Sequence, residues 1–255
     1  MKNKILIILL SCISILNFGE ILANSKDGSN LIVEADNSIE YFEKEKFYLA
    51  SGNATASKDG LSLNANEIKA FFKNKDNEID LLIGKGKVSI KNKEIFGKAE
   101  KVIYDFKKKI ITLSKGTQSL QTREAFIQSK KFLSFDNLKK IAKSKGTVKL
   151  ILKNKTKVYS NQLSATFNKK SNYLEKAIAK GNVLVITKSE ISSCDIAFFD
   201  KKTNLITLKG NVIIEKNNSK IIGEKGVTNL KTGITKLLGG KKNKRIKGKF
   251  ISNKK

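Results

Sequence analysis

Apolar side chains recur at every second position in many short segments of this 255-residue chain. Val183 and Val185 form one such pair, and Val212 and Ile214 form another. A period of two places these residues on one face of a β-strand. The segments are rich in Val, Ile, Thr, Phe and Tyr, which strands favour, and polar stretches such as 200–204 separate them as turns. Since no helical stripe follows residue 23, the pattern predicts an all-β fold.

The strand pattern repeats with a fixed period. An aromatic residue recurs every 30 to 32 residues, at Phe42, Phe72, Tyr104, Phe135, Phe167 and Phe199, with Leu230 in the seventh position. A glycine follows each of the six aromatic residues, at Gly52, Gly86, Gly116, Gly146, Gly181 and Gly210. Such a period is typical of stacked supersecondary units. We expect each glycine to form a corner where a strand bends between two sheets, although an ordinary turn glycine is the alternative.

The first 23 residues have the features of a leader. Lys2 and Lys4 precede an apolar run over 5–16, and Ala23 ends a short small-residue segment. This arrangement predicts a signal peptide over 1–23 that is cleaved after Ala23. An uncleaved anchor is an alternative, but the apolar run is shorter than the ~20 residues of a membrane span. A lipoprotein site at Cys12 is another. The β-repeat domain is then expected over 24–240 and a basic C-terminal tail over 241–255.

The formal charge is +28, with 51 Lys and Arg against 23 Asp and Glu. A field of this size favours anionic partners. The chain is also crowded with Lys, Asn and Ile and lacks Pro, so an AT-rich coding sequence accounts for the charge equally well. The densest basic run, 241–249, is suited to contact anionic lipid or phosphate, with a solvated tail as the alternative.

Several kinds of chemistry are excluded by composition. The chain has no histidine, which rules out a Ser-His-Asp triad, a Cys-His pair and histidine-based zinc sites. Once the leader is removed only Cys194 remains, so an intramolecular disulfide cannot form. Cys194 is expected to be a small core residue. The segment 84–87, Gly-Lys-Gly-Lys, lacks the length and the Ser/Thr of a phosphate-binding loop. We therefore predict a non-enzyme without catalytic residues, metal or cofactor.

The ordered motifs resemble those of the OstA-like family, in particular its LptA-type periplasmic lipopolysaccharide-transport members. The resemblance rests on the leader, on Leu31-Ile-Val-Glu-Ala-Asp36 before the first aromatic turn, on Gly52-Asn-Ala and on Leu61-Ser-Leu-Asn-Ala-Asn66. Segment 222–233 and the basic stretch 245–250 resemble the end of family members. The match covers most of the mature chain, which holds six or seven repeats, more than compact members have.

The resemblance implies a β-jellyroll of two facing antiparallel sheets, open at both ends, with an apolar groove between them. It implies transport of lipopolysaccharide, bound by its lipid A portion, from the inner to the outer membrane. The implied partners are LptC-like inner-membrane and LptD-like outer-membrane jellyrolls and further copies of the chain, stacked head to tail. In the family the N-terminal strand lines the groove, which nominates Leu31 and Val33. Val88 and Ile90 share one face after the second glycine, although plain core is the alternative for all four.

Two other hypotheses remain open. The chain is alternatively an exported β-repeat scaffold or adhesin with a sealed core, or an LptC-like component held in the membrane by its leader. Nucleic-acid binding fits the charge, but it conflicts with the leader and lacks a basic-aromatic module. We therefore expect no nucleic acid among the partners.

Overall fold

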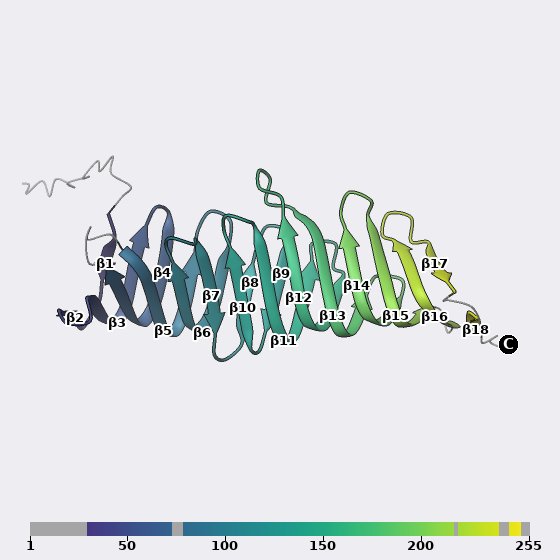
Figure 1. The fold of residues 1–255 in the computed structure, drawn as a ribbon, viewed down its shortest axis with the longest axis horizontal. Coiled ribbons are helices and arrows are strands. Elements are labelled where there is room, and N and C mark those ends of the chain that lie inside the picture. The colour runs from purple at the N-terminus through teal and green to yellow at the C-terminus, as the bar shows by residue number, and fades with distance from the viewer. Residues whose placement is uncertain (1–29, 73–78, 217–218, 240–244, 251–255) are drawn as a thin grey trace, which may run out of the picture.

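The computed structural model describes residues 30–72, 79–216, 219–239 and 245–250. In this part the chain forms strands and no helix, arranged as an elongated stack in which the sequence advances steadily from one end to the other (Figure 1). The strands are β1 (Ile32–Glu34), β2 (Ser38–Phe42), β3 (Phe47–Lys58), β4 (Leu61–Phe72), β5 (Ile79–Lys91), β6 (Phe96–Asp105), β7 (Ile110–Ser114), β8 (Gln118–Gln121), β9 (Ala125–Ser129), β10 (Phe132–Asp136), β11 (Ile141–Leu152), β12 (Lys157–Phe167), β13 (Leu174–Ile186), β14 (Ile191–Asp200), β15 (Leu205–Lys216), β16 (Ser219–Asn229), β17 (Thr235–Leu238) and β18 (Lys247–Lys249). All pairings between them are antiparallel.

The long strands bend in the middle, at the repeated glycines. Gly210 has φ +76° and Asn211 has φ +47°, and the pairing of β15 with β16 shifts register between Lys209 and Val212. The other five glycines also have positive φ, and a register shift of this kind accompanies Gly52, Gly86, Gly146 and Gly181. Glycine tolerates these angles, and a bulge there turns the strand sharply. The predicted corners are confirmed.

The bends divide the strands between two sheets. The first sheet comprises β2, β7, β10, β17 and one half of each long strand. The second sheet comprises β1, β8, β9, β18 and the other halves. The sheets meet along the line of glycine bends, called here the corner, and their hairpin turns face each other along the opposite side, called here the mouth. The chain is thus an all-β jellyroll of two facing sheets, as predicted.

The core fills the space between the sheets along the whole stack. Leu63, Leu113, Ile127 and Leu133 are fully buried there and belong to one continuous cluster. Next to the corner several inward residues are small: Ala54, Ala65, Ala99, Ser144, Ser160, Ala179, Cys194 and Ala197. On the first sheet they share a row with large buried side chains, since Leu163 lies opposite both Ser144 and Ala179, and Leu208 lies opposite Ala197. Small and large side chains therefore alternate across this part of the core.

The turns explain most of the aromatic repeat. Tyr104 and Phe135 point into the core, each followed by an aspartate whose carboxylate accepts hydrogen bonds from the turn. In the first copy, the prediction put Phe42 in the aromatic position, which is one residue too late. Strand pairing places Tyr41 in the inward position, while Phe42 stacks on Phe47 outside the core cluster. Leu230 likewise follows the capping Asn229, so its position differs from that of the other copies.

The two terminal segments can be compared with the predicted boundaries only in part. The predicted signal peptide lies outside the described residues. Lys247–Lys249, inside the predicted basic tail, forms β18 and extends the second sheet by pairing with β16. No helix long and apolar enough to cross a bilayer occurs among the residues that the structure describes.

Candidate functional site

The apolar interior reaches the surface at the N-terminal end, where β1 is the last strand of the second sheet. Leu31 and Val33 are partly buried and pack against the core cluster, whereas Ile32 between them is 59% exposed on the outer face. Val33 lies opposite Ala56, a fully inward residue of β3. The predicted site residues Leu31 and Val33 therefore line the interior at the edge of the described part of the second sheet.

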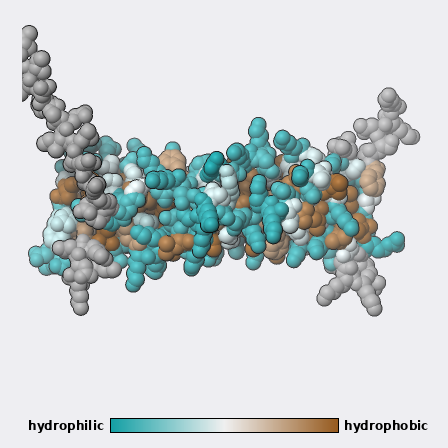
Figure 2. Space-filling view, turned by 90° about the horizontal axis from the view of Figure 1, so that it is seen from above, coloured by the Kyte–Doolittle hydropathy of each residue, from teal (hydrophilic) through white to brown (hydrophobic). Residues whose placement is uncertain are grey.

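The facing edge of the first sheet adds three residues that the sequence analysis missed. Ile39, Tyr41 and Tyr48 share the inward face with buried Ala50, yet they are 49%, 51% and 40% exposed. The two tyrosine rings lie 4.6 Å apart. Figure 2 shows apolar surface at this end of the molecule. The alternation of Ile39 and Tyr41 along β2 was the signal that could have found them.

The other two predicted residues lie deeper. Val88 and Ile90 of β5 face the same interior as Val33 but are only 2% and 0% exposed. In the second sheet, halves of β3 and β4 separate them from β1. The structure therefore puts all four predicted residues on the inner face of one sheet, two at an accessible edge and two inside a packed core.

A first polar bridge crosses the mouth in the middle of the stack. Lys140, in a turn of the first sheet, donates from Nζ to Oε2 of Glu94, in a turn of the second sheet. The same ammonium also donates to Asn137 Oδ1 at 3.1 Å. Lys140 is only 9% exposed. We call this pair the Lys140 bridge; it ties the two sheets together across their open side.

A second bridge lies toward the C-terminal end. Glu190, in the turn between β13 and β14 of the second sheet, is 5% exposed. Its carboxylate accepts hydrogen bonds from Thr228 Oγ1 at 2.8 Å and from Thr235 Oγ1 at 2.6 Å, both in the first sheet. Its own turn is held by Thr187, whose Oγ1 accepts from the Glu190 amide at 3.1 Å. We call this contact the Glu190 bridge. Like the Lys140 bridge, it was not predicted from the sequence.

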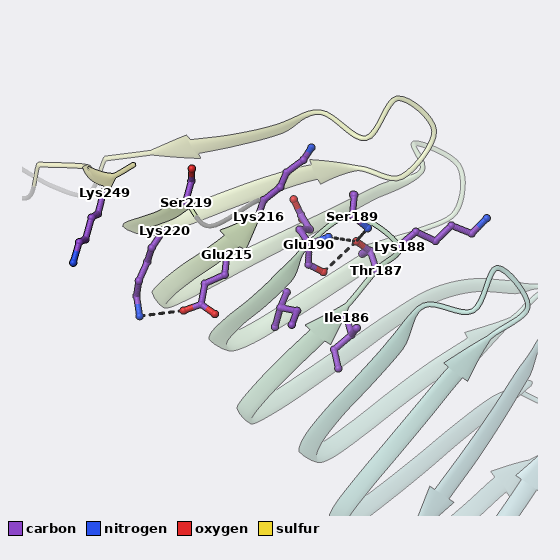
Figure 3. A pocket seen from close by; sticks show the side chains of 11 residues that line it. Ile186, Thr187, Lys188, Ser189, Glu190, Glu215, Lys216, Ser219, Lys220 and Lys249 are labelled. Carbon is purple, nitrogen blue, oxygen red and sulfur yellow. Dashed lines mark hydrogen bonds and ion pairs between the residues drawn. The ribbon is translucent and has the colours of Figure 1, made fainter. Parts of the chain in front are cut away.

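A pocket of about 650 Å³ adjoins Glu190 and mixes apolar and basic residues. Ile186 and Ile191 form part of its wall, and its rim carries four lysines and Glu215, which pairs with Lys220 at 3.1 Å (Figure 3). The side chains of Lys188 and Lys249 point in different directions. The lysines therefore form a dispersed positive rim and no convergent anion site.

The thiol of Cys194 is inert. Cys194 is buried in the core, as predicted, and its thiol donates to the Ile196 carbonyl at 3.3 Å. Burial raises the pKa of this thiol to about 11, so it is protonated at neutral pH. Across the described part of the chain, no three His, Cys, Asp or Glu side chains gather where they could hold a metal ion.

The fold and this site define a β-jellyroll with an apolar interior that is accessible at one end. Residues 32–132, and a second time residues 126–234, match the sequence model of the family described as LptA/(LptD N-terminal domain) lipopolysaccharide-transport protein. The two matches extend over most of the chain, and the chain belongs to this family. The family consists of transport proteins and not of enzymes, in agreement with the predicted absence of catalysis.

Comparison with solved structures gave a match to LptH of Pseudomonas aeruginosa, the LptA-homologous periplasmic component of the conserved lipopolysaccharide transport device. The match is 10% identical, covers 88% of this chain and 96% of that chain, and has a TM-score of 0.22. A comparison with curated proteins gave no match.

Proposed function

We propose that the protein is a periplasmic bridge that carries lipopolysaccharide from the inner to the outer membrane, holding its lipid A acyl chains between the two sheets. The observation that carries the proposal is the half-exposed apolar lining at the N-terminal end, formed by Leu31, Val33, Ile39, Tyr41 and Tyr48. This lining runs without interruption into the core cluster. Each methylene that leaves water there contributes about 0.8 kcal/mol.

Edge strands at both ends support the proposed partners. Among the described strands, β1 and β2 pair only with β3 and end the stack on one side, and β17 and β18 pair only with β16 and end it on the other. Unpaired edges of this kind accept a further strand. An LptC-like inner-membrane jellyroll, further copies of the chain and an LptD-like outer-membrane jellyroll would then add head to tail. Such stacking does not close on itself and so can span a gap between membranes.

The tight packing of the core supports a second candidate, an exported scaffold or adhesin with a sealed interior. Ile90 is fully buried, and an apolar cavity between the sheets measures only about 20 Å³. A carrier must therefore part its sheets to admit an acyl chain, whereas a scaffold never does. Uptake of an apolar fluorescent probe by delipidated protein separates the two, because only the carrier takes it up.

The proposal is tested by Val33→Asp, with Ile32→Asp as the matched control in the same strand. Full burial of a valine contributes about 1.5–3 kcal/mol, and an aspartate at the partly buried position of Val33 adds a charge to the apolar lining. We therefore expect Val33→Asp to weaken lipopolysaccharide binding about tenfold or more. Ile32 points outward, and its substitution should leave binding unchanged. Circular dichroism checks that both variants keep the sheet. Equal affinities for the two variants would remove Val33 from the groove.

A further inference from the structure

The mouth contains an opening between the Lys140 bridge and the Glu190 bridge. A cavity of about 240 Å³ lies there, walled by the turn between β11 and β12 on the second sheet and by the turn between β14 and β15 on the first. Leu152 and Phe199 line it from opposite sheets, and Lys153 and Lys201 stand at its rim. The cavity thus opens on the flank of the molecule, away from both ends of the stack.

The floor of this cavity continues into an apolar slot. Leu152 and Phe199 also line the 20 Å³ cavity between the sheets, whose other walls are aliphatic side chains apart from Thr156. On the first sheet three of these residues are short, Ala177, Ala179 and Ala197, and they lie beside the larger Leu163 and Ile206. A path therefore leads from the polar rim to the interior, past Leu152 and Phe199, with room made by small residues behind them.

Phe199 is packed less tightly than its equivalents. It is only partly buried, whereas Tyr104 and Phe135, at the same position in earlier copies, are 5% and 2% exposed. A side chain with an open side can move without breaking a packed cluster. Rotation of Phe199 toward its open side would widen the slot, which as it stands measures only about 20 Å³.

Comparison of two equivalent turns shows why the mouth is open here. Phe106 and Lys201 each follow the last residue of a strand, at the start of a four-residue turn. Each amide donates to a carbonyl near the start of the preceding strand, Asp80 of β5 at 3.0 Å and Glu175 of β13 at 2.8 Å. Each turn also has a residue with φ +54°, Lys109 in one and Asn204 in the other. Phe106 is 7% exposed and belongs to the core cluster. The earlier copy thus covers its interior with a phenylalanine where this copy has a lysine.

We infer that this flank opening binds one acyl chain of the lipopolysaccharide assigned under the proposed function, on which the inference rests, with a lipid phosphate at the rim. The chain inserts past Phe199 into the slot, and the phosphate lies beside the ammonium groups of Lys153 and Lys201. Glu124 pairs with Lys153 at 3.6 Å and offsets one of the two lysine charges, so the rim keeps a net positive charge. An apolar floor under a cationic rim matches an amphiphile with an anionic head. Lipid can therefore enter or leave the groove through the side as well as through the end.

The test uses the full mature protein and a dodecyl phosphate that carries a diazirine at the end of its alkyl chain. After illumination, labelled peptides are mapped by mass spectrometry. We expect label on the segments that contain Leu152 and Phe199, and separately on the N-terminal strand that contains Val33. Lys201→Phe, which copies Phe106, should lower the labelling of the Leu152 and Phe199 segments about tenfold, as expected for roughly 1.4 kcal/mol of lost affinity, and leave the Val33 segment unchanged.

Two further variants exclude trivial explanations. Lys202→Phe changes the next residue of the same turn, which is exposed and does not line the cavity, and should leave all labelling unchanged. Lys201→Ala keeps the opening but removes one charge, and should lower the labelling of the slot about threefold. If the wild-type protein is labelled in the Val33 segment but not in the segments that contain Leu152 and Phe199, the inference is overturned and the proposed function stays in place. Absence of label at both would contradict both, and slot labelling that survives in folded Lys201→Phe would also overturn the inference.

Discussion

Substitution of Glu190 tests the claim that the two sheets are tied together across the mouth. In Glu190→Ala, the carboxylate that accepts from Thr228 and Thr235 is removed. In Glu190→Gln, the shape and one good acceptor remain, but the charge does not. The two hydroxyls also lie 3.1 Å from each other, so part of their hydrogen bonding survives in either variant.

The expected loss follows from the two short contacts, at 2.8 and 2.6 Å. Hydrogen bonds to a charged group contribute about 1.5–3 kcal/mol each. Because the threonines can still bond to each other, we take the lower value for each contact. Glu190→Ala should then lower the free energy of unfolding by about 3 kcal/mol, and Glu190→Gln by about half as much.

Urea denaturation followed by circular dichroism measures these losses, and a double-mutant cycle assigns them. Thr235→Val in the wild type removes the 2.6 Å bond, whereas in the Glu190→Ala background that bond is already absent. We expect a coupling energy of about 1 to 2 kcal/mol. A loss below roughly 0.5 kcal/mol for Glu190→Ala, the range of ordinary surface changes, or a coupling near zero, would refute the view that Glu190 joins the sheets.

Three further predictions use other parts of the fold. Gly210 and Gly60 both have φ +76°, but an added methyl group would meet a carboxylate at Gly210 and open space at Gly60. Gly210→Ala should therefore lower the free energy of unfolding by about 2 kcal/mol and Gly60→Ala by about 1 kcal/mol. Equal urea midpoints for the two variants would contradict this. Cys194, with its pKa raised by burial to about 11, should resist alkylation at pH 8 until the protein is unfolded, and its labelling should rise as the pH approaches 11; rapid labelling of native protein at pH 8 would argue against burial. Glu94→Ala should lower the free energy of unfolding by about 2–3 kcal/mol, because it leaves the buried ammonium of Lys140 without its carboxylate partner. Lys140→Met should cost about 1 kcal/mol, since the Glu94 carboxylate can be hydrated. The reverse order in urea titrations would contradict the Lys140 bridge.

The fold could be predicted from the sequence because its determinants are local. A period of two sets the strand faces, an aspartate or asparagine closes many of the turns, and glycines such as Gly181 and Gly210 fix where the strands bend. The one-residue error at Phe42 arose because Tyr41 and Phe42 are both aromatic. Only the pairing with β3 shows which of them faces inward.

The bridges and the flank opening could not be predicted in this way. Glu94 and Lys140 are 46 residues apart, and Glu190 and Thr235 are 45 apart. These intervals do not match the 30- to 32-residue repeat, because a turn of the second sheet faces a turn of the first sheet that lies about one and a half copies later. Stacking brings such turns together, and a charged residue in a polar turn gives no signal of its own before the stack is known.

The central claim is tested most directly by photocrosslinking in cells, with a photoreactive residue in place of Val33. The account predicts an adduct with lipopolysaccharide that depends on the inner-membrane export ATPase, and no adduct when the residue replaces Ile32 on the outer face. A folded, exported protein that forms no adduct at Val33, Leu31 or Ile90 would contradict transport through the groove and would favour a sealed structural repeat protein.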